Sequence, residues 1–218
     1  MSESDSFIDE VSEELRRDRL FKTFKKYAWV LALGVVAIVG GTAYNEWSKS
    51  QIETEARLTG DLMRAATSAG NADALAGLAA ADSPSALIAR LQRANLLESQ
   101  GDVSGAVAEW RAVANDPAAA PIYTDLAWLK IIMADGANMD PGERNSAYER
   151  LMTPGAPYRL LAQEQRAMQY IRDGDIDAAK VELSAIIVDP EITPNLRARA
   201  QQLLVALGGE ITPVTTEG

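Results

Sequence analysis

The chain has 218 residues, 47% of them hydrophobic and 24% charged, with a formal net charge of −10. This composition is typical of a globular domain, and an acidic chain with no basic face is not expected to bind nucleic acid. The absence of Cys and His excludes Cys/His zinc sites, thiol nucleophiles and His-based proton transfer. Chemistry that uses carboxylates alone stays possible, but we expect no catalytic, cofactor-binding or metal site and no small-molecule substrate.

The first predicted element after the N-terminal leader is a membrane span. Residues 27–45, YAWVLALGVVAIVGGTAYN, carry no charge. Nineteen helical residues rise about 28 Å, which matches the hydrocarbon core of a bilayer. Tyr27 and Trp29 stand at one end and Tyr44 and Trp47 at the other, where aromatic rings favour the headgroup layer. The pattern predicts a transmembrane helix over 27–45.

The basic residues predict the orientation of this span. Six Lys and Arg lie between Arg16 and Lys26, whereas only Lys49 and Arg57 follow the span within fifteen residues. By the positive-inside rule, residues 1–26 are a cytoplasmic leader and the rest is periplasmic, as in a single-pass protein of a bacterial inner membrane. Gly41-Thr42-Ala43 also resembles a signal-peptide cleavage site, but the long acidic leader favours an uncleaved anchor.

Beyond the span, the pattern is helical and punctuated by short turns rich in Gly, Asp and Pro. We expect an extended helix and a first helix pair over 46–82, and further helix pairs over 83–208. Residues 195–207 are expected to form a terminal capping helix, followed by a flexible tail over 209–218.

An internal repeat organises the exported region. When Gly101 is aligned with Gly174, seven further positions match in character. The matched pairs are Ala94/Ala167, Leu97/Tyr170, Asp102/Asp175, Ala106/Ala179, Trp110/Leu183, Val113/Ile186 and Pro117/Pro190. Gly136 closes a degenerate middle copy, 35 residues after Gly101 and 38 before Gly174. A period near 34 with a Gly-Asp turn predicts an all-α fold of tetratricopeptide-like antiparallel helix pairs, an α-solenoid. Where the repeat consensus has large apolar residues, however, this chain has Arg90, Arg93, Gln163 and Arg166.

The whole arrangement resembles the YfgM-like ancillary subunits of the Sec translocon, the SecYEG channel. The resemblance covers about residues 5–208, and its most characteristic stretch is SPSALIARLQRANLLESQGDVSGAVAEWRAVANDP, residues 83–117. It implies a non-enzymatic protein bound to the translocon. The implied partners are translocon subunits, a membrane-anchored periplasmic chaperone resembling prolyl isomerases, and exported client proteins.

A tetratricopeptide array lines its concave face with the first helix of each pair. In this register the candidate partner-binding face is mainly apolar and suits an extended or helical peptide. Its residues are Ile88, Leu91, Asn95, Tyr123, Leu126, Lys130, Met133, Leu161, Glu164, Met168 and Ile171. In a short array that closes on itself, many of the same residues would instead be core.

The sequence also allows two other functions. The same architecture would serve a scaffold for envelope assembly or cell division, with different partners. An enzyme would need clustered carboxylates in a pocket, with Asp125 or Glu164 as candidates, and no motif assembles them.

Overall fold

The computed structural model describes the backbone of residues 3–81, 83 and 85–210, and the side chains of residues 29, 33–34, 36–81, 83 and 85–210. The chain divides into two compact units, Met1–Leu58 and Thr59–Gly218. The side chains of the predicted leader, several of those in the predicted span, and the predicted tail from residue 211 onward lie outside the described residues.

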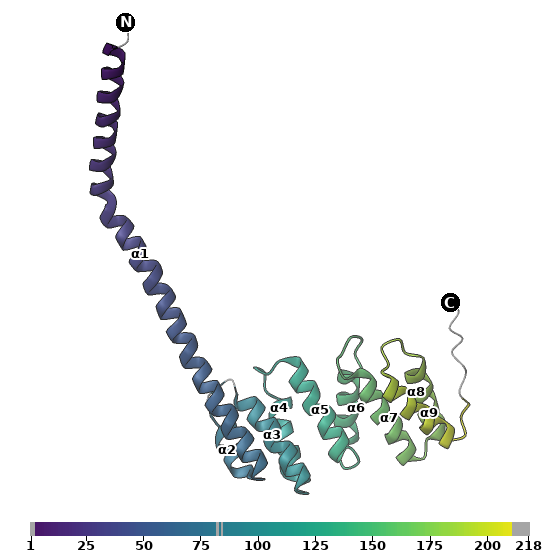
Figure 1. Cartoon of the computed structure of the whole chain (residues 1–218). Coiled ribbons are helices and arrows are strands. Elements are labelled where there is room, and N and C mark those ends of the chain that lie inside the picture. Colours follow the sequence, from purple (N-terminus) through teal and green to yellow (C-terminus); the bar gives the residue numbers. More distant parts are fainter. Residues whose placement is uncertain (1–2, 82, 84, 211–218) are drawn as a thin grey trace. The chain divides into compact units, whose positions relative to one another are not determined.

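Within the described residues the fold is entirely α-helical, which confirms the predicted all-α class. Nine helices follow one another along the part of the chain that the structure describes (Figure 1). Their bounds are α1 Glu3–Ser68, α2 Ala72–Ala79, α3 Ala86–Ser99, α4 Val103–Ala114, α5 Pro121–Asp135, α6 Pro141–Leu151, α7 Arg159–Asp173, α8 Ile176–Val188 and α9 Pro194–Ala206.

The first unit consists of most of α1. Large apolar side chains of its described part lie exposed between residues 29 and 47, namely Trp29, Leu33, Val36, Ile38, Val39, Tyr44 and Trp47. Among the residues that the structure describes, no helix is both long and apolar enough to cross a membrane. The side chains of residues 27, 28, 30–32 and 35, which belong to the predicted span, lie outside the described residues.

The second unit is a series of helix pairs in which, from α2 to α9, each helix packs against its neighbour in sequence. Three apolar clusters form its core. The first joins the end of α1 to α2 and α3 through Met63, Ala66 and Leu75. The second spans α3 to α7 around Trp110, and the third joins α7, α8 and α9 around Leu183.

The two aligned copies have the same helix–turn–helix structure. Helices α3 and α7 begin 73 residues apart, as do α4 and α8. Gly101 and Gly174 have φ angles of 87° and 80°, in the left-handed region that favours glycine. Asp102 then caps α4 by accepting a 2.9 Å hydrogen bond from the Gly105 N–H, and Asp175 caps α8 through Ala178 at 3.1 Å.

Small residues at equivalent positions let the paired helices approach closely. Ala94 and Ala167, on the first helices, and Ala106 and Ala179, on the second helices, are all fully buried. Trp110 and Leu183 fill the space toward the next helix and are also fully buried. Both copies therefore share one packing scheme, which is compatible with tetratricopeptide-like pairs.

A further copy of the turn joins α1 to α2, inside the region where the sequence predicts a first helix pair, although the alignment of the repeat did not include it. Gly70 has a φ of 64°, and Asn71 accepts a 3.0 Å hydrogen bond from the Ala74 N–H. The last residues of α1 and the whole of α2 therefore form the first helix pair of the series. The signal was visible as Gly70-Asn71, since Asn caps a helix as well as Asp does.

The middle pair departs from this geometry. Gly136, at the C-terminal end of α5, has a φ of −56° and so does not make the left-handed turn. Four further residues lead to α6, and Asp140 caps that helix by accepting hydrogen bonds from the Gly142 and Glu143 N–H groups at 2.9 Å and 3.1 Å.

Candidate partner-binding grooves

All of the candidate face residues lie on the first helices of the pairs. Ile88, Leu91 and Asn95 are on α3, and Leu161, Glu164, Met168 and Ile171 are on α7. The remaining four, Tyr123, Leu126, Lys130 and Met133, are on α5. The structure divides these residues between two grooves and the half-buried surface of the core.

The N-terminal groove lies between the end of α1 and α3 and has a volume of about 680 Å³. It includes Ile88 and Asn95 of the candidate face. Its lining is Gly60, Met63, Arg64, Thr67, Ser68, Ile88, Gln92, Asn95, Leu96 and Ser99. Six of these ten residues have polar side chains, but most of the exposed lining surface is apolar.

The C-terminal groove lies between α5, α7 and α9 and has a volume of about 660 Å³. It includes four residues of the candidate face, and its lining is Met133, Leu161, Glu164, Gln165, Met168, Arg199, Gln202, Leu203 and Ala206. The contribution of α9 was not predicted, because α9 was expected only to cap the series.

The two grooves are related by the internal repeat. Ile88 corresponds to Leu161, Gln92 to Gln165 and Asn95 to Met168, each 73 residues later, and both members of each pair line their groove. The chief difference among these pairs is Asn95 against Met168, and the exposed lining of both grooves is mostly apolar. The repeat thus places the same face of the first helix toward a groove in both copies.

An ion pair forms one wall of the C-terminal groove. Arg199 donates from Nε and Nη2 to the two carboxylate oxygens of Glu164, at 2.9 Å and 2.8 Å. The hydrogen bond to Glu164 raises the pKa of Arg199 above its ordinary value. Because the Glu164 side chain is buried and paired, the groove carries an apolar surface with little net charge.

The other candidate face residues support the core. Leu91 and Tyr123 are half-buried against the cluster around Trp110, and Leu126 and Ile171 are also half-buried. Lys130 lies over the Trp110 ring, with Nζ 5.4 Å from the centroid, and it pairs with Glu98 at 3.2 Å. These positions match the alternative that part of the predicted face is core.

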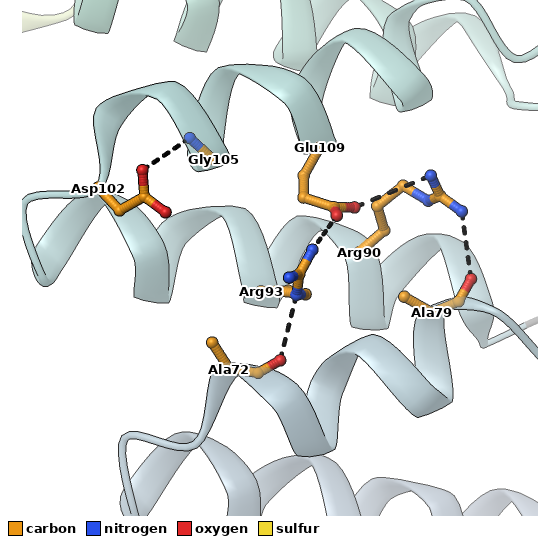
Figure 2. A network of polar contacts seen from close by, with 7 residues as sticks. All are labelled: Ala72, Ala79, Arg90, Arg93, Asp102, Gly105 and Glu109. Atoms are coloured by element: carbon orange, nitrogen blue, oxygen red, sulfur yellow. Dashed lines mark hydrogen bonds and ion pairs between the residues drawn. The ribbon is translucent and has the colours of Figure 1, made fainter.

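Arginines explain the departures from the repeat consensus. Arg93 on α3 pairs with Glu109 on α4, and Arg90 lies 3.8 Å from the same carboxylate (Figure 2). Arg90 and Arg93 also donate to the backbone carbonyls of Ala79 and Ala72 at the two ends of α2. A charged network therefore joins three successive helices where apolar contacts would otherwise do so.

The second aligned copy repeats this pairing. Arg166 on α7 donates to Glu182 on α8 at 2.5 Å, and both residues lie 73 positions after Arg93 and Glu109. Each Arg is only partly exposed, and each Glu is largely buried. The charged pair is therefore a repeated part of the packing between paired helices.

The two carboxylates considered for an enzyme are each held by an arginine from another helix. Asp125 accepts a 2.8 Å hydrogen bond from Arg150, as Glu164 does from Arg199. Among the residues that the structure describes, no group of three or more Asp and Glu is placed to hold a metal ion.

Comparisons of the chain with family models, with curated proteins and with solved structures gave no match. The class of the protein accordingly rests on its fold, an all-α series of helix pairs with two grooves related by an internal repeat.

Proposed function

We propose that the protein is a membrane-anchored, periplasmic scaffold of the YfgM-like kind, which binds protein partners beside the Sec translocon. The observation that carries the proposal is the run of large apolar side chains exposed on α1 from Trp29 to Tyr44, inside a stretch without charge. The second unit of the same chain offers an apolar groove. Contiguous exposed apolar surface of this kind marks a membrane or partner contact.

The anchor is supported by the cost of leaving these side chains in water. Burying one large apolar side chain is worth about 1.5–3 kcal/mol, and seven of them are exposed between residues 29 and 47. The uncharged stretch over 27–45 has the length of a bilayer core. A lipid environment would remove this surface from water and would satisfy the helix backbone internally.

The periplasmic placement and the partners rest on the charges and on the resemblance. The basic flank before residue 27 favours a cytoplasmic N-terminus, which leaves the grooves on the other side of the membrane. Translocon subunits and a membrane-anchored periplasmic chaperone are the expected partners, with exported clients as further ligands. The mechanism is binding: the anchor concentrates the grooves close to the export channel.

Membrane insertion is tested by a matched pair of charge substitutions on α1. Val39 and Ile52 are both exposed, but only Val39 lies within the predicted span. A charged residue at the centre of a span costs about 2.5–3.5 kcal/mol of insertion free energy. Val39→Glu should therefore increase extraction of the full-length protein by alkaline carbonate, and Ile52→Glu should not. Complete extraction of the unaltered protein would refute the anchor.

The partner assignment is tested by photo-crosslinking in intact cells. A photoreactive residue at Met133, in the C-terminal groove, should capture translocon or periplasmic chaperone subunits, whereas one at Val181, on the exposed surface of α8, should capture fewer. Capture of division or envelope-assembly proteins alone would favour the other scaffold function. A reporter fused after residue 218 that is active only in the cytosol would refute the orientation.

A further inference from the structure

The lining of the C-terminal groove presents flexible apolar side chains to a ligand. Five apolar side chains line it: Met133, Leu161, Met168, Leu203 and Ala206. Met133 is 55% exposed and Leu161 is 39% exposed, so both present apolar surface to a ligand. The N-terminal groove also has a mostly apolar exposed lining, but Asn95 stands there in place of Met168.

The polar groups of the C-terminal groove suit a peptide backbone more than a charged side chain. Gln165 and Gln202 supply amide donors and acceptors. The carboxylate of Glu164 already accepts two hydrogen bonds from Arg199, so the two charges neutralise each other. Methionine side chains adapt to different apolar partners. The groove therefore fits apolar side chains of varied shape and offers backbone hydrogen bonds.

The charge of the surrounding unit selects among such peptides. Residues 59–210 carry 13 Lys and Arg against 20 Asp and Glu. Nine of the cations, among them Arg159 and Arg166, are paired with carboxylates in the described structure. Among the acids outside these pairs, Asp140, Asp173 and Asp177 are exposed. An acidic surface raises the association rate of a basic ligand and repels an acidic one.

From these features we infer that the C-terminal groove binds a polypeptide segment with an apolar centre and a net positive charge. The segment belongs to a partner or client protein, and the apolar centre contacts Met133, Leu161 and Met168. The acidic surface of the unit contributes attraction that depends on ionic strength. This inference deepens the proposed function and rests on it only for the identity of the partner, because the groove itself lies within the second unit.

Fluorescence anisotropy with the full-length protein in mild detergent tests the inference without requiring membrane insertion or a translocon. The probe is a short labelled peptide with Leu, Ala and Val at its centre and Lys at both ends. A second peptide has Glu in place of Lys. The Lys peptide should bind at least about tenfold more tightly than the Glu peptide at low salt, and this difference should shrink as salt rises.

Substitutions of exposed residues locate the binding site. The double variant Met133→Asn/Leu161→Asn should weaken binding of the Lys peptide by about tenfold or more, because it removes apolar contacts without adding charge. Val181→Asn is the matched control, since Val181 is 68% exposed on α8 and lines neither groove. Equal binding by the double variant and the control would overturn the inference, as would equal affinity for both peptides.

A truncated chain ending at Glu210 tests a competing occupant, the segment ITPVTTEG over 211–218. Unchanged affinity of the Lys peptide for this variant would support a groove that is open to partners. A large gain in affinity would overturn the inference by assigning the groove to the chain's own C-terminal segment.

Discussion

Glu164 on α7 holds Arg199 on α9 through two hydrogen bonds of 2.9 Å and 2.8 Å, across 35 residues of sequence. This pair fixes the last helix against the preceding helix pair and also forms a wall of the C-terminal groove. The carboxylate of Glu164 is buried, while the guanidinium of Arg199 is half exposed. Removing one partner is therefore expected to cost a different amount of stability than removing the other.

Removing the arginine should therefore destabilise the second unit. Arg199→Ala leaves the buried Glu164 carboxylate without its two hydrogen bonds, and we expect the free energy of unfolding to fall by about 1–3 kcal/mol. Chemical denaturation followed by circular dichroism measures this change. Arg197→Ala, at an exposed position on the same helix, should change stability by less than about 0.5 kcal/mol. Equal effects of the two substitutions would show that the pair is not structural.

The close approach of paired helices should make the repeated alanines intolerant of larger side chains. Ala94→Leu and Ala167→Leu each add three carbons at a fully buried position, and we expect each to destabilise by about 1–3 kcal/mol or more. Ala108→Leu is the control, because Ala108 is exposed on α4. Thermal denaturation compares the three variants, and a tolerated Ala167→Leu would argue against equivalent packing in the two copies.

Because some glycines form left-handed turns, a Gly→Ala substitution should lower or raise the free energy of unfolding according to its position. Gly101→Ala and Gly174→Ala should each destabilise by about 1 kcal/mol because of backbone strain alone, since no atom lies near the added methyl group. Gly77→Ala should instead stabilise by about 0.5–1 kcal/mol, because Gly77 lies inside α2 and its methyl group would also enter open space. The denaturant midpoints of the three variants, compared with that of the unaltered protein, show whether each substitution stabilises or destabilises the fold.

Tyr148 should give the unfolding free energy a dependence on alkaline pH. Burial raises the pKa of its hydroxyl from 10.0 to about 12. As pH rises above 10, the unfolded chain releases this proton before the folded chain does, so stability should decline by about 2 kcal/mol between pH 10 and pH 12. Tyr148→Phe should remove this part of the decline.

The same substitution has a second expected outcome at neutral pH. Within the described structure the buried Tyr148 hydroxyl has no hydrogen-bond partner. Tyr148→Phe should therefore leave stability unchanged at pH 7 or raise it by up to about 1 kcal/mol. Urea denaturation at pH 7, 10 and 12 measures both effects, and an unchanged alkaline slope would contradict the assignment.

The internal repeat could be predicted from the sequence because its signals are local. Gly101 followed by Asp102 encodes a left-handed turn and a helix cap within a few residues, and the small residues Ala94 and Ala106 mark the close contact between the helices on either side. Arg93 could not be interpreted in the same way. Its partner Glu109 lies on the next helix, and only their packing shows that a charged pair replaces an apolar contact.

The sequence by itself therefore determined the helical class, the helix pairs and their turns, since backbone preference and capping depend on neighbouring residues. Only the tertiary structure decided which residues of the first helices remain accessible. Leu161 and Lys130 were both predicted to lie on the partner-binding face. In the structure Leu161 lines a groove, while Lys130 lies over Trp110 and pairs with Glu98. Accessibility is set by the side chains that neighbouring helices bring alongside, and α9 reaches the groove from residues that lie far along the chain.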